Sequence, residues 1–393
     1  MSRSPGPSGA RAISVLHIAD RVLSPDLDGA SARDHAILRA FRSLGCRITF
    51  VAHHPESFYA YARTVARDTA RLEAIGVEVV RPPQAPSVEA LLAARGAEFR
   101  LVVMSPYPIA HRYLPVVRRD APAARAVYNA MDVGHVQHYR RARATGNVPD
   151  LRRAIEAKQQ ELTLARTADA VLVCSEEDRD AFHRLCPTAR LLVASHVMPL
   201  RPAATGFEER AGAIFLGSFP HLANVDAMTY FVREVLPEVR AALPQLELTI
   251  VGLDPRGDLA PLVGPGVTAT GWVPDLDAVF AKARVFVAPL RYGAGIKVKV
   301  LDSLARGVPV VATSLAAEGL HLSDGESALI ADGRAAFAAA VVRLHGDRAL
   351  WQRLVDGGHA VLRRHFSESA MEAALAPLLA GIGGRNGYDD AAH

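Results

Sequence analysis

Short apolar runs alternate with amphipathic stretches along almost the whole chain. The first apolar run, at 13–19, precedes a stretch at 31–45 whose apolar residues recur every three or four positions, which predicts a strand followed by a helix. Gly45 ends this stretch, as glycine commonly ends helices. Four further strand-like runs begin at residues 100, 125, 169 and 190. Continuous runs of this kind are typical of parallel strands that are covered on both faces.

A break in the pattern divides the chain. Residues 197–212 contain mostly Pro, Gly, Ala and charged residues, and a second alternating series follows. Strands alternating with helices on both sides of a linker predict an α/β protein with two doubly wound, Rossmann-like parallel-sheet domains. We predict an N-terminal domain at 12–196, a C-terminal domain at 213–365 and a helix at 366–380 that packs back on the first domain. Ligands are then expected at the carboxyl ends of the strands, in a cleft between the domains.

Composition narrows the class of protein. The 393 residues are 50% hydrophobic and 22% charged, which gives enough apolar material for two cores. A formal net charge of +4 is too small to indicate a nucleic-acid-binding protein, but it is compatible with anionic small substrates or a membrane surface. Three cysteines have no metal-ligand spacing, so we expect a cytoplasmic protein. We expect disordered ends at 1–11 and 381–393.

A membrane-spanning helix is not predicted. No segment approaches the roughly 20 consecutive apolar residues that a membrane-spanning helix needs. Any membrane contact is therefore expected to be peripheral, at the inner face of the membrane.

The most informative stretch is YGAGIKVKVLDSLARGVPVVAT, at 292–313. A glycine-rich turn leads into a helix that we expect to begin near Lys297 and to end at Arg306, with Gly307 as its terminator. On a helical wheel, the apolar side comprises Val298, Leu301, Leu304 and Ala305, and the opposite side comprises Lys299, Asp302, Ser303 and Arg306.

Two interpretations of this stretch are open on local physics. In the first, backbone amides, the positive end of the helix dipole and Lys297 or Lys299 bind a phosphate, and Asp302 accepts hydrogen bonds from sugar hydroxyls. In the second, the polar side is a solvated helix face with a Lys299–Asp302 pair that contributes a few tenths of a kcal/mol.

The same stretch, followed by AAEGL and DGESALIAD, resembles the C-terminal domain of glycosyltransferase family 4 (glycosyl transferases group 1), which has the GT-B fold. The resemblance continues upstream through IFLGSFPHLANVDAMTYFVREVLPEV, LELTIVG and VTATGWVPDLDAVFAKARVFVAPL, and so covers nearly all of the second domain. The first domain is similar more loosely, in LHIAD, DGASARDHAILRAFRSLGCRITFV and RAVYNAMDVGHVQHYRRAR.

The resemblance implies a retaining glycosyltransferase that uses a nucleoside-diphosphate sugar as its donor. The backbone of 293–296 with Lys297 and Lys299 would hold the diphosphate, Asp302 the ribose, and the backbone of Val273 the base. Trp272 would be either a base platform or a core residue. The implied donor-binding residues are Gly29, Gly217, Ser218, Val273, Tyr292, Gly293, Ala294, Gly295, Ile296, Lys297, Lys299 and Asp302.

Two departures from the family pattern affect this site. Ala294 and Asp302 stand where the family has its two signature glutamates. Many relatives also carry a basic residue soon after the first strand of this domain, but the segment here is GSFPHLAN. The cationic role would therefore fall to Lys297 and Lys299, with Arg291 as a further candidate.

The implied catalytic residues are Lys299 and, in NAMDVGH after a strand end, Asp132 and His135. His135 could equally be a hydrogen-bonded loop histidine. Arg33, just after Gly29, is either an anion ligand or a solvent-facing side chain. The Asp275–Asp277 segment DLD is interpreted as a helix N-cap with an acidic first turn rather than as a metal motif. No metal or other cofactor is expected.

The implied chemistry is stabilisation of the departing diphosphate, whose released oxygen would act as the base for the acceptor hydroxyl. The expected acceptor is a glycan, a lipid-linked molecule or a protein, and the expected pathway is polysaccharide assembly. Two alternatives remain: a hexosamine-nucleotide epimerase of the same architecture, or a non-catalytic protein that binds nucleotides or carbohydrates.

Five arginines lie between Tyr139 and Arg153. Their concentration indicates either an exposed helix face or a surface for anionic lipid headgroups or a phosphorylated acceptor.

Overall fold

The computed structural model describes residues 12–54, 64–201, 205–254 and 256–382. The predicted disordered start at 1–11, and the predicted tail from residue 383 onward, lie outside these residues. The chain divides into two compact units. Unit 1 comprises Met1–Val133, Glu156–Val197 and Glu368–His393, and unit 2 comprises Gly134–Ile155 and Met198–Ser367.

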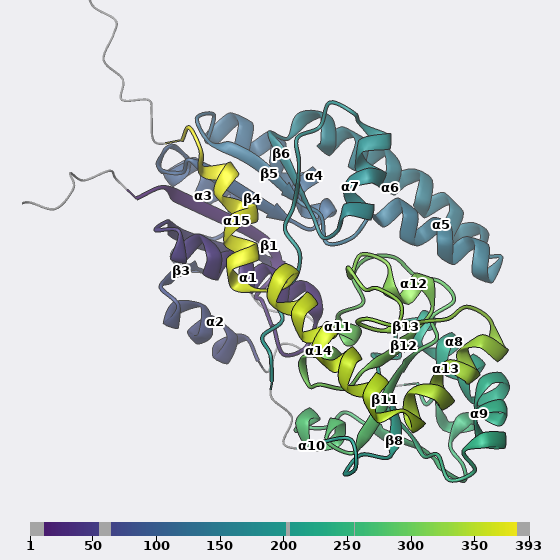
Figure 1. Cartoon of the computed structure of the whole chain (residues 1–393). Helices are drawn as coiled ribbons and strands as arrows, with labels where there is room; N and C mark the ends of the chain where they lie inside the picture. The colour runs from purple at the N-terminus through teal and green to yellow at the C-terminus, as the bar shows by residue number, and fades with distance from the viewer. Residues whose placement is uncertain (1–11, 55–63, 202–204, 255, 383–393) are drawn as a thin grey trace, which may run out of the picture. The chain divides into compact units, whose positions relative to one another are not determined.

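Unit 1 is built from alternating strands and helices (Figure 1). Its elements are β1 (Ser14–Arg21), α1 (Gly29–Ser43), β2 (Arg47–His54), α2 (Val65–Ala74), β3 (Val77–Val80), α3 (Val88–Arg95), the 3₁₀ turn η2 (Gly96–Glu98), β4 (Leu101–Ser105), α4 (Tyr107–Asp120), β5 (Arg125–Asn129), the greater part of α6 (Val148–Thr167), β6 (Ala170–Val173), α7 (Glu176–Leu185), β7 (Leu191–Val193) and α15 (Glu368–Leu379).

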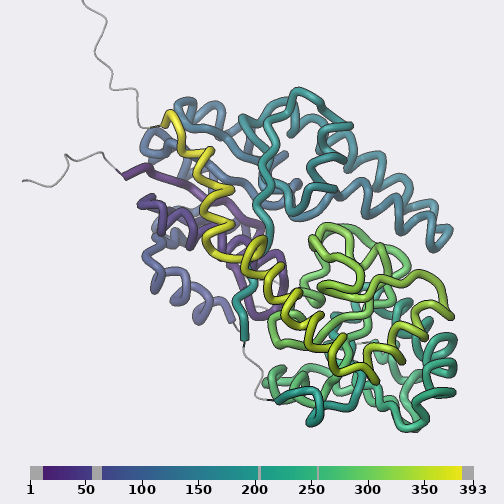
Figure 2. The backbone as a smooth tube through the Cα atoms, viewed as in Figure 1, coloured from purple at the N-terminus to yellow at the C-terminus, as the bar shows by residue number. Residues whose placement is uncertain are grey.

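The strands of unit 1 form one parallel sheet in the order β3-β2-β1-β4-β5-β6-β7. All the strand runs predicted from the hydrophobic pattern before residue 197 are strands of this sheet. The C-terminal helix α15 packs against α1, and the backbone trace shows the two side by side (Figure 2). Met371, Leu375 and Leu378 of α15 join the core beneath α1, which explains why the end of the chain belongs to this unit.

Unit 2 repeats the same alternation. Its elements are α5 (Gly134–Thr145), the start of α6, β8 (Gly212–Leu216), α8 (Leu222–Tyr230), the π-helical segment η3 (Phe231–Val235), α9 (Leu236–Ala242), β9 (Leu248–Val251), the 3₁₀ turn η4 (Ala260–Leu262), β10 (Val267–Gly271), α10 (Leu276–Phe280), β11 (Ala283–Ala288), α11 (Val298–Ala305), β12 (Val310–Ala312), α12 (Ser314–Ala317), β13 (Leu329–Ile330), α13 (Arg334–Gly346) and α14 (Arg348–His365).

The second sheet is also parallel, in the order β10-β9-β8-β11-β12-β13. Separate clusters of buried apolar side chains cover its two faces, one with α9 and α13 and the other with α11 and part of α14. The prediction of two doubly wound, Rossmann-like parallel sheets is therefore confirmed. In each sheet the strand order reverses beside the first strand, between β1 and β4 and between β8 and β11. Ligands of such sheets bind at the carboxyl ends of the strands at this reversal.

One segment differs from the predicted domain boundaries. Residues 134–155 were placed in the N-terminal domain at 12–196, but the structure groups them with unit 2. The physical reason is a set of bonds from Arg140 on α5 to Gly293 and Glu318, which lie more than 150 positions further along the chain.

Among the described residues, no helix combines the length and the hydropathy needed to cross a bilayer.

Candidate functional site

The predicted glycine-rich stretch lies at the strand-order reversal of the second sheet. The loop at 289–297 follows β11, and the loop at 217–221 follows its neighbour β8. Gly293 and Gly295 have φ angles of 136° and 69°, in the left-handed region that favours glycine. The sequence Gly-Ala-Gly is thus explained by the backbone of the turn. Tyr292, Ala294 and Ile296 are all partly buried in this loop.

Helix α11 leaves this loop as predicted, with Lys297 as its N-cap and Arg306 as its C-cap. The amide of Gly307 donates to Leu304 (3.0 Å) and that of Val308 to Ser303 (3.0 Å). This is a Schellman ending, and the φ of 63° at Gly307 is the left-handed conformation that it needs.

The second interpretation of the stretch, a solvated polar face on α11, is wrong. Ser303 and Arg306 are 0% and 4% exposed, and Val300, outside the predicted apolar side, is fully buried. The hydroxyl of Ser303 donates to the carbonyl of Val308 (2.7 Å), so the polar group is satisfied inside the fold. The helix is enclosed because elements pack against it from several sides, which a single apolar stripe does not reveal.

Lys299 is the most unusual charged group of the site. Its ammonium donates a hydrogen bond to the side-chain oxygen of Asn224 and lies 4.7 Å from the ring centroid of Phe215. Asn224 is held in turn by its own bond to the carbonyl of Ser218 (2.7 Å). Burial, with a smaller contribution from the charge of Lys297, lowers the pKa of Lys299 to about 7. The fold therefore holds a partly buried cation near the carboxyl end of β8.

The loop after β8 lies close to its neighbours. A Cβ on Gly252 would lie 1.6 Å from the carbonyl oxygen of Gly217, so position 252 requires glycine, and a Cβ on Gly217 would lie 2.7 Å from the ring of Phe215. His221 in this loop has its pKa lowered by burial and, to a smaller extent, by Lys299. The segment GSFPHLAN thus places a neutral histidine, rather than a permanent cation, near the lysine.

Lys297 and Arg291 make other contacts. The ammonium of Lys297 donates to the carbonyl of Gly295 (2.8 Å) and lies 3.8 Å from a carboxylate oxygen of Glu318. The guanidinium of Arg291 forms a two-bond pair with Asp226 (2.9 and 2.5 Å). Of the three candidate cations, Lys299 is the one whose contacts lie at the end of β8.

Arg140 and Glu318 were not among the predicted site residues. Arg140 makes a bidentate pair with Glu318 (2.6 and 2.8 Å) and donates to the carbonyl of Gly293 (3.0 Å). The Arg140 hydrogen bonds, more than Lys297, hold the pKa of Glu318 below its ordinary value. Helix α5 is thereby tied to the glycine loop. The sequence signal for Glu318 was its place in AAEGL, soon after β12; for Arg140 it was only membership of the arginine cluster.

Asp302 lies one turn along α11, but it does not pair with Lys299. Its carboxylate accepts from Arg306 (2.6 Å), which also donates to Asp277 (2.6 Å). Asp277 lies in the first turn of α10, whose N-cap Asp275 accepts from the amide of Ala278 (3.2 Å). The interpretation of DLD as a helix N-cap is confirmed.

The predicted base-binding segment follows β10. Trp272 is 59% exposed, so its interpretation as a core residue is wrong. Val273 is partly buried and packs against the apolar cluster beneath α11.

The structure separates the predicted residues of the first domain. Gly29 begins α1 and Asp132 follows β5, both in unit 1, whereas His135 lies in the first turn of α5 in unit 2. Arg33 is 0% exposed, so its interpretation as a solvent-facing side chain is wrong. In unit 2, the predicted residues at 217–218, 273 and 292–297 follow the carboxyl ends of β8, β10 and β11.

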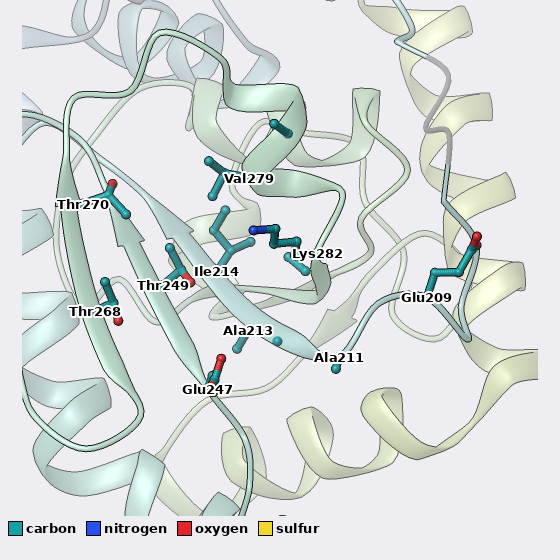
Figure 3. Close-up of a pocket in the computed structure, with 13 residues that line it drawn as sticks. Glu209, Ala211, Ala213, Ile214, Glu247, Thr249, Thr268, Thr270, Val279 and Lys282 are labelled. Carbon is teal, nitrogen blue, oxygen red and sulfur yellow. The ribbon is translucent and has the colours of Figure 1, made fainter.

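A separate cavity of about 490 Å³ lies along the sheet of unit 2 (Figure 3). Its lining includes Thr249 of β9, Thr268 and Thr270 of β10, Glu247 just before β9 and Lys282 after α10. None of the predicted site residues is among the described residues that line it.

Within the described part of the chain, no group of three or more His, Cys, Asp or Glu side chains is arranged to hold a metal ion.

The Arg140–Glu318 pair allows a first prediction. Arg140→Gln and Glu318→Gln should each weaken ligand binding at the glycine loop, because the first removes the bond from α5 to the carbonyl of Gly293 and the second removes the carboxylate that holds Arg140 in place. The double variant should lose less than the two single losses added, by roughly 0.5–1 kcal/mol for a partly exposed pair. A double-mutant cycle on ligand affinity measures this coupling. The exposed pair Arg348–Glu208 is the control, and strictly additive losses at 140 and 318 would contradict the prediction.

Comparison with known proteins finds a family match within unit 2. Residues 210–347 match the family model of glycosyl transferases group 1. A lipopolysaccharide core biosynthesis glycosyltransferase of Rhizobium meliloti, LpsE, is 34% identical over 153 residues, which are 37% of this chain and 45% of LpsE. The chain spans less than half of the length of the curated relatives it matches (36% and 45%).

Solved structures match over nearly the full length. Sucrose-phosphate synthase from Thermosynechococcus elongatus superimposes with a TM-score of 0.68 at 16% identity, over 93% of this chain and 98% of that one. Anabaena HepE, solved with UDP and glucose, gives a TM-score of 0.64 at 15% identity, over 93% and 99%. At such identities the likeness shows the fold alone, and that fold is GT-B.

Proposed function

We propose that this protein is a retaining glycosyltransferase, and the match of residues 210–347 to the family model of glycosyl transferases group 1 supports this. It transfers a sugar from a nucleoside-diphosphate sugar to a hydroxyl of an acceptor, without a metal ion. The relative named for lipopolysaccharide core biosynthesis supports a role in glycan assembly at the cell envelope. HepE, solved with UDP and glucose, makes UDP-sugars the first donors to test.

One observation carries the proposal: the partly buried ammonium of Lys299 is held by Asn224 at the strand-order reversal, in the first turn of α11. Burying an ammonium group costs free energy. An anionic ligand bound beside it would offset that cost, so an anion-binding role is the best explanation of its position. The amino end of α11 adds a positive partial charge and backbone N–H groups, which together suit a diphosphate.

The arrangement suggests how each group would act. As the bond from the sugar to the diphosphate breaks, negative charge grows on the leaving oxygen, and Lys299 with the amides of the glycine loop would stabilise it. The hydrogen bond to Asn224 would orient the ammonium of Lys299 towards the diphosphate. Arg140 and Glu318 would hold the loop at 293 in place, so that its amides need not reorganise during the reaction. The departing phosphate oxygen would take the proton of the acceptor hydroxyl, and Asp132 and His135 are the proposed residues beside the reacting groups.

Purified protein incubated with a panel of UDP-, GDP- and dTDP-sugars tests the proposal. We expect one donor class to bind and to release its nucleoside diphosphate, with the anomeric configuration retained in the product. Interconversion of nucleotide-hexosamines without transfer would instead identify an epimerase. Binding without turnover across donors and acceptors would identify a non-catalytic protein, and no nucleotide binding would refute the assignment of the site.

The pKa of Lys299 predicts how nucleotide binding depends on pH. A diphosphate binds the protonated ammonium, so affinity should fall as pH rises through about 7, by up to about tenfold per pH unit. Titrations between pH 7.5 and 9.5 avoid the phosphate's own ionisation near pH 6. Calorimetry in buffers of different ionisation enthalpy should show proton uptake on binding at pH 7.5. An affinity that does not change over this range would contradict the prediction.

A further inference from the structure

We propose that the helical hairpin at 134–155 is a docking surface for an anionic lipid membrane. This hairpin comprises α5 and the start of α6, joined by Gly146 and Asn147. The proposal goes beyond the transferase activity, since it concerns where the protein resides and not what it transfers. It is carried by the charge and the exposed apolar side chains of this one segment.

The hairpin carries a concentrated positive charge, of which Arg140 is paired with Glu318. Five arginines and one aspartate give these 22 residues a formal charge of +4, equal to that of the whole chain. The aspartate, Asp150, is 0% exposed and pairs with Arg141 (3.0 Å) and Arg153 (3.2 Å). Arg143 and Arg152 are exposed. The surface of the hairpin is therefore basic, and its one carboxylate is turned inward.

Apolar side chains are exposed on the same hairpin. It carries four of the nine exposed large hydrophobic side chains among the described residues: Tyr139 (49%), Val148 (62%), Leu151 (43%) and Ile155 (55%). Val148, Leu151 and Ile155 are spaced three and four apart on α6, so they form one stripe, and Arg152 lies within it. The buried residues Asp150 and Ala154 occupy the opposite side of the helix.

This combination fits a lipid surface better than other partners. An apolar stripe flanked by arginines is the pattern of helices that lie in the membrane interface, where the stripe enters the acyl boundary and the arginines meet anionic headgroups. A second copy of this chain would bring two surfaces of like charge together. Nucleic acid would gain nothing from the aliphatic stripe, which offers no stacking surface.

The test is binding of the full chain to vesicles, without donor or acceptor, so that it is independent of the transferase assay. We expect binding to phosphatidylcholine vesicles that contain a quarter phosphatidylglycerol, release by 0.5 M salt, and little binding to phosphatidylcholine alone. Val148→Ser/Leu151→Ser/Ile155→Ser and Arg143→Gln/Arg152→Gln should each weaken binding by roughly tenfold or more.

Matched variants control for total charge and hydrophobicity. Arg334→Gln/Arg348→Gln removes the same charge elsewhere in unit 2, and Leu253→Ser/Val263→Ser removes other exposed apolar groups. Both should bind vesicles as the parent does, and unchanged melting temperatures should show that all variants fold. The proposal is overturned by no binding to anionic vesicles, by equal losses in the controls, or by a stripe that instead holds a dimer in light scattering.

Discussion

Lys299→Met is expected to lower kcat/KM for the donor by on the order of 10²-fold and, at the same time, to raise the melting temperature at pH 6. The first effect follows because Lys299 is the proposed cation for the leaving diphosphate, and the loss of one preorganised donor at a developing anion has about this size. The second follows because burial lowers the pKa of Lys299 to about 7, so the charged form is disfavoured in the folded state.

The gain in stability expected for Lys299→Met depends on pH, because the pKa of Lys299 differs between the folded and the unfolded chain. An unfolded lysine has a pKa near 10.5, so between about pH 7 and 10.5 the unfolded chain binds more protons at this position than the folded chain. The penalty for burying Lys299 is thus full below pH 7 and fades as pH rises towards 10.5. Relative to the parent, the gain in melting temperature for Lys299→Met should be largest at pH 6 and smaller at pH 9.

Lys282→Met is the matched control. Lys282 lines the separate cavity of unit 2 and carries no part of the proposed site. The control should change neither kcat/KM nor the pH dependence of stability. A loss of activity in Lys299→Met that is accompanied by a lower melting temperature at pH 6 would mean that Lys299 is structural, which would contradict its role as the cation of the site.

The fold was predictable because its signal is local. Apolar runs such as 285–290 and 170–173 are continuous, contain β-branched residues and are separated by helical patterns, so each strand could be assigned from its own sequence. The turn at 293–295 and the cap at Gly307 were equally local, because glycine is the residue type that their left-handed backbone favours.

The contacts within the site were not predictable in the same way. The helical wheel left open a solvated face for Lys299, because a wheel shows one helix and not the neighbours that pack against it. Its bond to Asn224 joins residues 75 positions apart, and the bonds of Arg140 to Glu318 join residues 178 positions apart. Arg140 is one of five arginines between residues 139 and 153, and it differs from the others because it contacts Glu318. That contact follows from the fold and is not visible in the sequence pattern.

Arg33→Met is expected to destabilise unit 1 by about 3–5 kcal/mol, the usual size of loss when one partner of a buried charged network is removed. Arg33 is fully buried, and its guanidinium donates to the carbonyl of Ala194 (2.8 Å), the side chain of Asn129 (2.7 Å) and the carbonyl of Ala130 (3.2 Å). It thus joins the carboxyl ends of β5 and β7, and methionine would leave their acceptors buried without a donor.

Calorimetry and urea unfolding measure this loss, and Arg39→Met on the same helix is the control. Arg39 is half exposed and pairs with Glu368 at the surface, so its loss should cost at most about 1 kcal/mol. Arg33→Lys keeps the charge but not the planar fork, and should fall between the parent and Arg33→Met. If Arg33 were instead a ligand for an anionic substrate, Arg33→Met would weaken substrate binding and leave stability near that of Arg39→Met. A structural role predicts lower stability of the Arg33→Met variant, and a ligand role predicts weaker substrate binding with nearly unchanged stability. A stable Arg33→Met variant would therefore contradict the structural role.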